Sequence, residues 1–576
     1  MGKALGTILQ IAVAVFAPYA AAALGLTGFG ATLFKFALQG VVGMITQKSS
    51  LFGGGGQSGS GGGGGAGSSS DQGLLLNQQG TSNPVYIIYG ERRIGANRVF
   101  IDTTNGDGGQ SGADRDEYLH EAFSICEGEI GWISAMHFQD RIAWIHPDIF
   151  AYYNSTSSGD DRFRENNPYF VGAKAYDSGL TYDTWINGQP ASLFLEGGAL
   201  EGEEKQWWGW DTSNGHSKYF EGRSDEEKLT PDGNKLFNLK LWRGTENQTR
   251  SNAWFESDSG ETWMSDIWLE QNRDAKGIAA AYIRLKYNRD VFSGAPTIQF
   301  DVLGKRVRNI LNNNTLVSND TYENAYDELA LYTNPANAIQ DYLTNTLYGK
   351  GLSDNLIDTN SLGALALYTA AKGLDCNGVI NPAATIFENT DRLLNTANSY
   401  IVNSQGKYVL KPLDALDFNG AYEFNQDNIL GEWNIQMGSK KAMMNRVVVN
   451  FFNPDENWQQ DIYTYPEDDA TNPYLIADSN VLNEKTLDLP MVASRAQAEK
   501  MGEYILKLSR YQDMVNFKTT WEALKLDVGD PVTITHPTPG WTNKQFRLIS
   551  MTLNQDGTVD VVLMEYPDTN IWIPNI

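Results

Sequence analysis

The residue types best suited to chemistry gather between residues 201 and 210. Glu201-Gly202-Glu203-Glu204 brings three carboxylates next to Trp207, Trp208 and Trp210. Aromatic rings pack on sugar faces, and carboxylates bind hydroxyls or serve as the acid and base of glycoside hydrolysis. Three interpretations are open: an aromatic core strand beside an acidic loop, glycan or receptor contact, and hydrolysis. The core strand is favoured, because 70 acidic residues produce carboxylate pairs by chance.

Other candidate sites fit known ligand patterns poorly. The oxygen-rich stretch Asp102 to Glu117 departs from the D-x-D-x-D-G calcium loop. If Asp107 is taken as a ligand, the next ligand position, two residues later, is occupied by Gly109. The five histidines are scattered, without HxxxH or HExxH spacing. Cys126 and Cys376 are far apart without CxxC spacing, which predicts buried free thiols. We therefore expect no catalytic site, no metal ion and no cofactor, and we do not predict an enzyme.

Length and charge limit the class of protein. A chain of 576 residues predicts three or four domains, and 41% hydrophobic residues with 11% aromatics indicate a globular bulk. The formal charge of −26 argues against bulk nucleic-acid binding, because affinity for phosphates depends on Lys and Arg. The same sign suits a protein that lets DNA pass without holding it, although many ordinary proteins are also acidic.

The N-terminus begins with a long uncharged run between Lys3 and Lys35. It is long enough to cross a bilayer as a helix, which needs about 20 residues. A signal peptide, a membrane anchor and a Gly/Ala-rich helical hairpin that packs against copies of itself are all open interpretations. A Gly/Ser tether from Gly53 to Ser70 separates this run from the body. The residues expected to plug a channel or contact a membrane are Ile11, Val13, Val15, Phe16, Leu24, Leu26, Phe29, Leu33 and Phe34.

The remaining chain is predicted to be α+β and mainly β, with a small helical middle domain. Asn334-Pro335 supplies an N-cap residue and a proline at the first helical position, and Tyr348-Gly349 is expected to end that helix. Leu362, Leu365 and Ala366 predict a second helix, and a third is expected from Asp391 to Val402.

The last domain is predicted to contain a helix from Ala496 to Leu508 and several antiparallel strands. Val528-Gly529-Asp530-Pro531 predicts a turn, and Asp556-Gly557 predicts a hairpin whose two turn residues both have positive φ. A small closed barrel is expected, because closure removes exposed strand edges.

Several motifs follow one another in the C-terminal part of the chain. They are Asn445-Arg446-Val447-Val448-Val449-Asn450-Phe451-Phe452-Asn453-Pro454, Asn457-Trp458, the helical run Arg495 to Arg510, Trp521-Glu522-Ala523-Leu524, Val528-Gly529-Asp530-Pro531-Val532-Thr533-Ile534, Phe546-Arg547-Leu548-Ile549-Ser550 and Asp556-Gly557-Thr558. This order resembles the conserved half of the lambda-type tail tip protein J family, the central tail hub of siphophages.

Two upstream segments extend the resemblance. Ser124-Ile125-Cys126-Glu127-Gly128-Glu129-Ile130 is similar to the "SEGPIEG" opening of the J-type hub domain, without its proline. The segment from Val85 to Val99 resembles the end of the small tail-tip assembly protein encoded beside J. The resemblance covers Pro84 to the C-terminus, with the Trp-rich region as a gap.

The resemblance implies several antiparallel β-barrel or β-sandwich hub domains around the helical domain. The expected divisions are an apolar helical plug or membrane-active segment (1–50), a Gly/Ser linker (51–72), first hub strands (73–150), a Trp/Gly-rich insertion (151–273), return strands (274–320), a helical domain (321–415) and a C-terminal hub β-barrel region (416–576).

The function implied by the resemblance is that of a structural virion protein at the distal end of a phage tail. Such a hub closes the tail tube and opens for DNA ejection at host attachment. The implied partners are two further copies in a homotrimer, the distal tail protein and other tail-tip proteins, the tape measure protein, passing DNA without specific binding, and the host outer membrane. The main alternative is a membrane-anchored or secreted β-rich glycan-binding protein. A tail-tip lysin would need a catalytic constellation that the sequence does not reveal.

Overall fold

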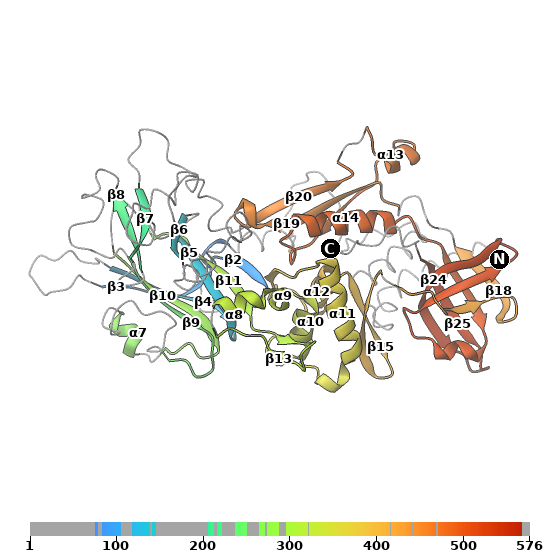
Figure 1. Ribbon diagram of the computed structural model, residues 1–576, viewed down its shortest axis with the longest axis horizontal. Helices are drawn as coiled ribbons and strands as arrows, with labels where there is room; N and C mark the ends of the chain where they lie inside the picture. The colour runs from blue at the N-terminus through green and yellow to red at the C-terminus, as the bar shows by residue number, and fades with distance from the viewer. Residues whose placement is uncertain are drawn as a thin grey trace, which may run out of the picture.

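The computed structural model describes residues 75–78, 83–104, 118–138, 141–145, 206–211, 216–221, 237–249, 264–270, 273–286, 295–320, 322–414, 416–436, 438, 443–467 and 470–566. Within these residues the protein is mainly β with few helices. Paired sheets form one end of an elongated arrangement, helices lie in the middle, and a curved sheet forms the other end (Figure 1). A smaller layer of strands and helices runs along the top of that view.

The first module is a sandwich of two four-stranded antiparallel sheets. One sheet has the order β3 (Asn97–Thr104), β4 (Tyr118–Glu127), β10 (Ile278–Lys286) and β9 (Phe237–Arg243). The other has the order β2 (Glu91–Ile94), β11 (Ile298–Lys305), β5 (Ile130–Phe138) and β6 (Arg141–Ile145). Apolar residues of both sheets share one core, which includes Phe123, Ile283, Ile133 and Phe300.

The Trp/Gly-rich region contributes to this sandwich. Strand β9 comes from it and pairs with β10 over its whole length. The short helix α7 (Asp266–Glu270) carries Trp268, which packs with Phe100 and Tyr282 on the outer face of the same sheet. Strand β9 therefore joins this region to the sheet by backbone pairing. The prediction of an insertion did not include such a strand.

The middle module is helical. It contains α8 (Tyr322–Asp327), α9 (Leu329–Tyr332), α10 (Pro335–Thr344), α11 (Thr359–Lys372) and α12 (Ile386–Thr396), followed by the hairpin β15 (Ser399–Ser404) and β16 (Lys407–Pro412). Short pairs link β12 (Arg308–Asn309) with β13 (Thr315–Leu316), and β1 (Ile88–Tyr89) with β14 (Gly378–Val379). Because β1 comes directly before β2, this pairing ties the helical module to the segment that enters the sandwich.

Local signals explain where these helices begin. The Asn334 side chain accepts the N–H of Ala336, and Pro335 occupies the first turn, as predicted. Helix α11 contains Leu362, Leu365 and Ala366, which are all buried. Helix α12 begins at a capping box between Thr385 and Glu388.

Two predicted helix ends are wrong. Helix α10 stops at Thr344, because Asn345 is extended and its side chain accepts the N–H groups of Leu347 and Tyr348. The third helix ends at Thr396, and most of the remaining predicted helical residues lie in β15. Asn398 has a positive φ of 46°, which breaks the helix, and the β-branched side chains of β15 suit a hairpin.

A third module places one helix on a three-stranded sheet. The sheet order is β20 (Gln459–Tyr465), β19 (Arg446–Asn453) and β21 (Glu484–Asp488), with α13 (Pro473–Ala477) between β20 and β21 in the chain. Helix α14 (Arg495–Leu508) confirms the predicted helix and packs on β19. Gly502 permits this contact, since a Cβ there would lie 2.7 Å from Val449 Cγ2.

The last module is a six-stranded curved sheet. Its order is β17 (Tyr422–Phe424), β23 (Pro531–His536), β24 (Trp541–Leu553), β25 (Val559–Glu565), β22 (Met514–Thr519) and β18 (Ile429–Gln436). Strands β17 and β18 lie at the two edges of this order, so the expected closed barrel is wrong and the sheet is a half-barrel. Pairing of β18 is interrupted between Leu430 and Asn434, and β17 has only three residues, which limits backbone closure.

Side chains nevertheless cross the open half-barrel. Trp433 of the interrupted β18 lies 4.4 Å from His536 and 5.7 Å from Trp541, measured between ring centroids. The hairpin between β24 and β25 is also confirmed, but only Gly557 has positive φ at its turn. The Gly557 N–H bonds to Asn554 and the Asn554 N–H to Thr558, which indicates a longer turn than the predicted two-residue type.

Candidate functional site

The residues predicted to plug a channel or contact a membrane, Ile11 to Phe34, all lie outside the described residues. In the part of the chain that the structure describes, no helix is long and apolar enough to span a bilayer. The predicted plug is therefore untested by the geometry.

The candidate sugar-binding tryptophans lie on one strand. Trp207, Trp208 and Trp210 belong to β7 (Gln206–Asp211), which pairs with β8 (His216–Glu221) in the register Trp207↔Phe220 and Trp208↔Tyr219. The prediction of a strand here is confirmed. The contacts of these side chains lie outside the described part of the structure, so glycan contact stays a prediction.

Both cysteines are buried and free, as predicted. Burial raises the pKa of the Cys126 thiol to about 12, which keeps it protonated at neutral pH. Among the described residues, no group of three His, Cys, Asp or Glu side chains could hold a metal ion.

A buried ionic junction joins the sandwich to the third module. Arg93 of β2 makes two contacts with Asp301 of β11, Nε to Oδ1 at 2.6 Å and Nη2 to Oδ2 at 2.9 Å. His137 Nε2 lies 2.8 Å from Asp301 Oδ2, and Arg93 Nη1 donates to Asn457 Oδ1 at 3.3 Å. Burial opposes ionisation of Asp301, but Arg93 and His137 outweigh it and hold the pKa of that carboxyl below its ordinary value.

Arg92 adds an aromatic contact to the same junction. Its guanidinium carbon lies 3.7 Å from the centroid of Phe452 and 5.2 Å from the ring of Trp458. The two predicted motifs around Arg92 and Trp458, more than 350 residues apart in sequence, therefore meet in space. Such cation–π contacts stabilise more when they are desolvated, as Arg92 is here.

A second buried polar network joins the helical module to the half-barrel. Tyr368 of α11 donates to Asp414, which is fully buried, and Lys372 Nζ lies 3.8 Å from Asp414 Oδ2. Arg547 of β24 and Tyr566 both donate to the carbonyl of Leu413. Burial and the neighbouring Asp414 raise the pKa of Tyr368 well above its ordinary value, so the phenol remains a donor.

Aromatic rings surround Arg547 in this network. Its guanidinium carbon lies 5.2 Å from the ring of Tyr400 and 4.8 Å from that of Tyr566. The sequence analysis singled out Phe546-Arg547-Leu548 as a motif without assigning a role to the arginine. The structure indicates that Arg547 is buried and connects the two modules.

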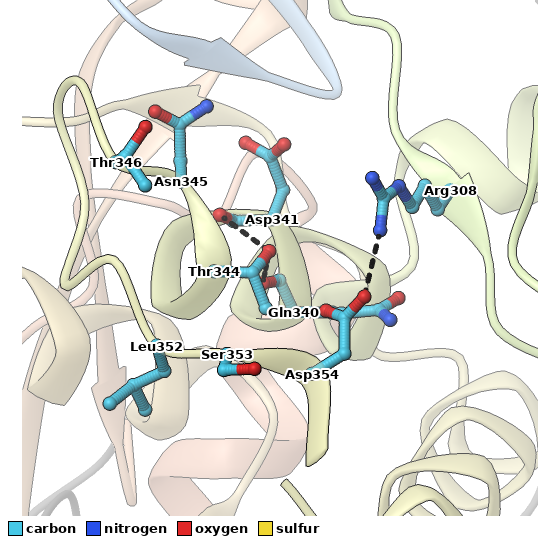
Figure 2. A pocket seen from close by; sticks show the side chains of 9 residues that line it. All are labelled: Arg308, Gln340, Asp341, Thr344, Asn345, Thr346, Leu352, Ser353 and Asp354. Atoms are coloured by element: carbon cyan, nitrogen blue, oxygen red, sulfur yellow. Dashed lines mark hydrogen bonds and ion pairs between the residues drawn. The ribbon is translucent and has the colours of Figure 1, made fainter. Parts of the chain in front are cut away.

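A polar pocket of about 400 Å³ lies on the helical module (Figure 2). The last turn of α10 contributes Gln340, Asp341 and Thr344. Arg308 of β12 lies across the pocket from Asn345 and Thr346 in this view, and Ser353 and Asp354 form another part of the wall.

The Asp341 carboxylate of this pocket is hydrogen-bonded to two tyrosine hydroxyls. Asp341 Oδ2 accepts from the hydroxyls of Tyr89 at 2.7 Å and Tyr348 at 2.6 Å. Burial, followed by the charge of Asp341, raises the pKa of both tyrosines, so both stay protonated as donors. The exposed pair between Arg308 and Asp354, at 3.4 Å, is a weak surface contact.

Gln340 is the most deeply buried polar residue of the pocket, with 4% of its surface exposed. Its Nε2 donates to Asn314 Oδ1 at 3.1 Å, while its Oε1 is buried with no hydrogen-bond partner among the described residues. A buried acceptor without a donor is uncommon in native proteins. Sequence analysis missed this pocket, because its residues lie in three separate segments and carry no local motif.

Comparisons with known proteins bear on the class of this chain. Residues 392–549 match the family described as "Putative phage tail protein". Over 314 residues the chain is 20% identical to the baseplate hub protein pb3 of Escherichia phage T5, covering 50% of this chain and 31% of that relative. The chain therefore spans about a third of the curated relative that it matches.

Two solved structures are similar in part. A chain of the virion of the native gene transfer agent particle is 11% identical and has a TM-score of 0.47, covering 87% of this chain and 88% of that chain. Prophage tail protein gp18 from Listeria monocytogenes EGD-e is 14% identical and has a TM-score of 0.20, covering 32% of this chain and 54% of that chain. Both TM-scores are too low to establish a shared fold. The sequence matches support a phage tail protein that is similar to a baseplate hub.

Proposed function

We propose that this chain is a subunit of the central hub at the distal end of a long phage tail. Three copies form a closed ring that continues the tail tube, keeps it shut, and opens for DNA ejection at host attachment. The observation that carries the proposal is the 314-residue match to a protein named as a baseplate hub. The tail-protein match over residues 392–549 supports it independently.

The physical properties of the chain suit this role. A cyclic assembly ends without further contacts, so three copies need no additional partner to terminate the ring. Each copy carries a formal charge of −26, which repels DNA phosphates. The buried network around Asp301 connects the sandwich to the third module, and the one around Asp414 connects the helical module to the half-barrel; a part that bears load during attachment needs such connections.

The proposed partners follow from a position at the tail end. They are the distal tail protein and other tail-tip proteins, the tape measure protein that ends at the hub, and the host outer membrane. DNA passes through without specific binding. No enzymatic step forms part of this proposal.

The N-terminal run has a separate role in the proposal. We infer that its apolar residues meet on the ring axis as a plug and later enter the host membrane. The motive is the uncharged run between Lys3 and Lys35 followed by a Gly/Ser tether. Particles lacking residues 1–50 are expected to assemble and to lose DNA early or fail to deliver it. Full delivery by stable particles of this kind would remove the plug.

Gold-labelled antibodies against the purified chain provide a direct test of location. Labelling confined to one end of the tail, opposite the head, is the expected result. Labelling along the tail shaft, at the head, or on no particle would overturn the hub proposal.

A further inference from the structure

We propose that the pocket around Gln340 binds the guanidinium group of an arginine presented by another protein chain. The site is separate from the proposed plug and from the buried junctions between modules. Its chemistry does not depend on the hub proposal, which bears only on which protein would supply the arginine.

A buried acceptor in the pocket needs a donor. Gln340 Oε1 has no donor among the described residues, while the Nε2 of the same amide is already directed to Asn314. Rotating the amide would leave the nitrogen without Asn314 and would not resolve the deficit. A ligand that donates into the pocket would satisfy this oxygen, whereas a ligand that only accepts would not.

Charged side chains in the lining give the pocket a negative balance. Asp341 and Asp354 give the pocket two carboxylates against one guanidinium, that of Arg308. The pocket also lies at the C-terminal end of α10, where helix carbonyls carry partial negative charge. Both features favour a cation and disfavour phosphate or carboxylate ligands.

The size of the pocket suits an amino-acid side chain. A volume of about 400 Å³ accommodates a side chain and is far larger than a bare ion requires. A guanidinium offers five donors in a rigid fork, which suits acceptors on different walls such as Gln340 and Asp354. Leu352 adds an apolar side chain to the lining.

Arg308 itself illustrates the contact. Its guanidinium approaches Asp354 from the rim at 3.4 Å, and both side chains are about half exposed. An incoming arginine can share Asp354, because that carboxylate is exposed. The arginine of this proposal belongs to another polypeptide that reaches the surface of the helical module, since Arg308 already pairs with Asp354 from within the chain.

The test uses the full chain and a small probe, Nα-acetyl-arginine amide, observed by saturation-transfer NMR. The matched control ligand is Nα-acetyl-citrulline amide, which has nearly the same shape and no charge. Saturable binding of the arginine probe in the millimolar range, with at least about tenfold weaker binding of citrulline, is expected. Equal binding of the two, or no saturable binding of arginine, would overturn the proposal. So would saturable binding of methyl α-D-glucoside in preference to arginine.

Two variants connect binding to the pocket. Gln340→Met keeps the side-chain volume and removes the buried acceptor, and Asp354→Asn removes an exposed charge without disturbing the core. Both are expected to weaken the arginine probe several-fold, while Gln459→Met on β20 leaves it unchanged. Because Asp354 is exposed, that variant keeps the test informative if Gln340→Met does not fold. Unchanged binding in Asp354→Asn would contradict the proposal, and electron microscopy of the hub would be unaffected by that result.

Discussion

Arg93 and Asp301 stand opposite each other on β2 and β11 and form a buried ion pair through two separate contacts. Both residues are 6% exposed, and Arg93 also donates to Asn457 in the turn before β20. One side chain thus belongs to the sandwich and to its junction with the third module. Removing either partner would leave a charge buried without its counter-ion.

Replacing Arg93 with Met is expected to destabilise the protein by about 3–5 kcal/mol, because Asp301 would remain buried without its main partner. Arg495→Met is the matched control, since Arg495 forms an exposed pair with Glu499 one helical turn away. That change is expected to cost at most about 1 kcal/mol. The denaturant midpoint of each purified variant measures both effects. Similar losses in the two variants would contradict the assigned role of Arg93.

Gly529→Ala is expected to disturb the contact between the hairpin β15–β16 and the half-barrel. Gly529 has φ of +92°, and an added Cβ would lie 2.2 Å from the hydroxyl of Tyr400. Gly540 also has positive φ, at +70°, but has no neighbour within 4 Å of that position. Both alanine variants are strained, by roughly 1 kcal/mol or more, and only Gly529→Ala adds a clash. The melting temperature should therefore fall more in Gly529→Ala than in Gly540→Ala. Equal decreases in the two variants would refute the close contact between Gly529 and Tyr400.

The hydrogen bond between Tyr368 and Asp414 should show energetic coupling. Tyr368→Phe removes a donor from a fully buried carboxylate, at a cost of about 1–3 kcal/mol. In a double-mutant cycle with Asp414→Asn, the two losses should not add, with a coupling of at least about 0.5 kcal/mol. Unfolding free energies of the four proteins give this quantity. Strict additivity would indicate that the two groups do not interact in solution.

His120 is expected to make stability depend on pH. Burial, followed by the charge of Arg284, lowers its pKa to about 4, although Asp102 opposes the shift. Its ring nitrogens face the hydroxyls of Tyr282 and Thr104. Between the ordinary pKa of about 6.5 and the folded value, the unfolded chain binds more protons. Stability is therefore full above that range and is lost as the pH falls through it, by on the order of 3 kcal/mol.

The variant His120→Gln isolates this effect. The difference in melting temperature between wild type and variant should shrink as the pH falls from 7 to 4. Protonation of Asp301 also destabilises the protein in acid. Because the pKa of Asp301 is lowered, that loss of stability occurs at lower pH, and it affects the wild type and the variant alike. A difference that stays constant over this range would contradict the buried neutral state of His120.

Local sequence signals predicted the helices better than the sites. Asn334-Pro335 and the apolar spacing of α14 act within a few residues, so the pattern alone identifies them. The six-stranded sheet stays open because the pairing of β18 is interrupted and β17 is short. Both features depend on strands that are distant in the sequence, so the local pattern did not predict them. The ion pair of Asp301 could have been anticipated from the sequence, since a carboxylate inside an apolar strand requires a buried partner.

No local sequence pattern predicts the pocket around Gln340. Arg308, Gln340 and Asp354 come from a short strand, the end of an α-helix and a short 3-10 helix, and only tertiary packing brings them together. The two networks around Asp301 and Asp414 have the same origin. Their members are ordinary charged or aromatic residues in sequence, and burial is what gives them a role.

The central claim is that three copies of this chain form the hub that closes the tail tube. Electron-microscopy class averaging of tail tips on intact particles tests it most directly. The proposal predicts a three-fold ring, with a passage near the width of duplex DNA that is closed by density joined to the N-termini. A tail tip without three-fold density, or a chain found only as a monomer apart from any particle, would contradict it.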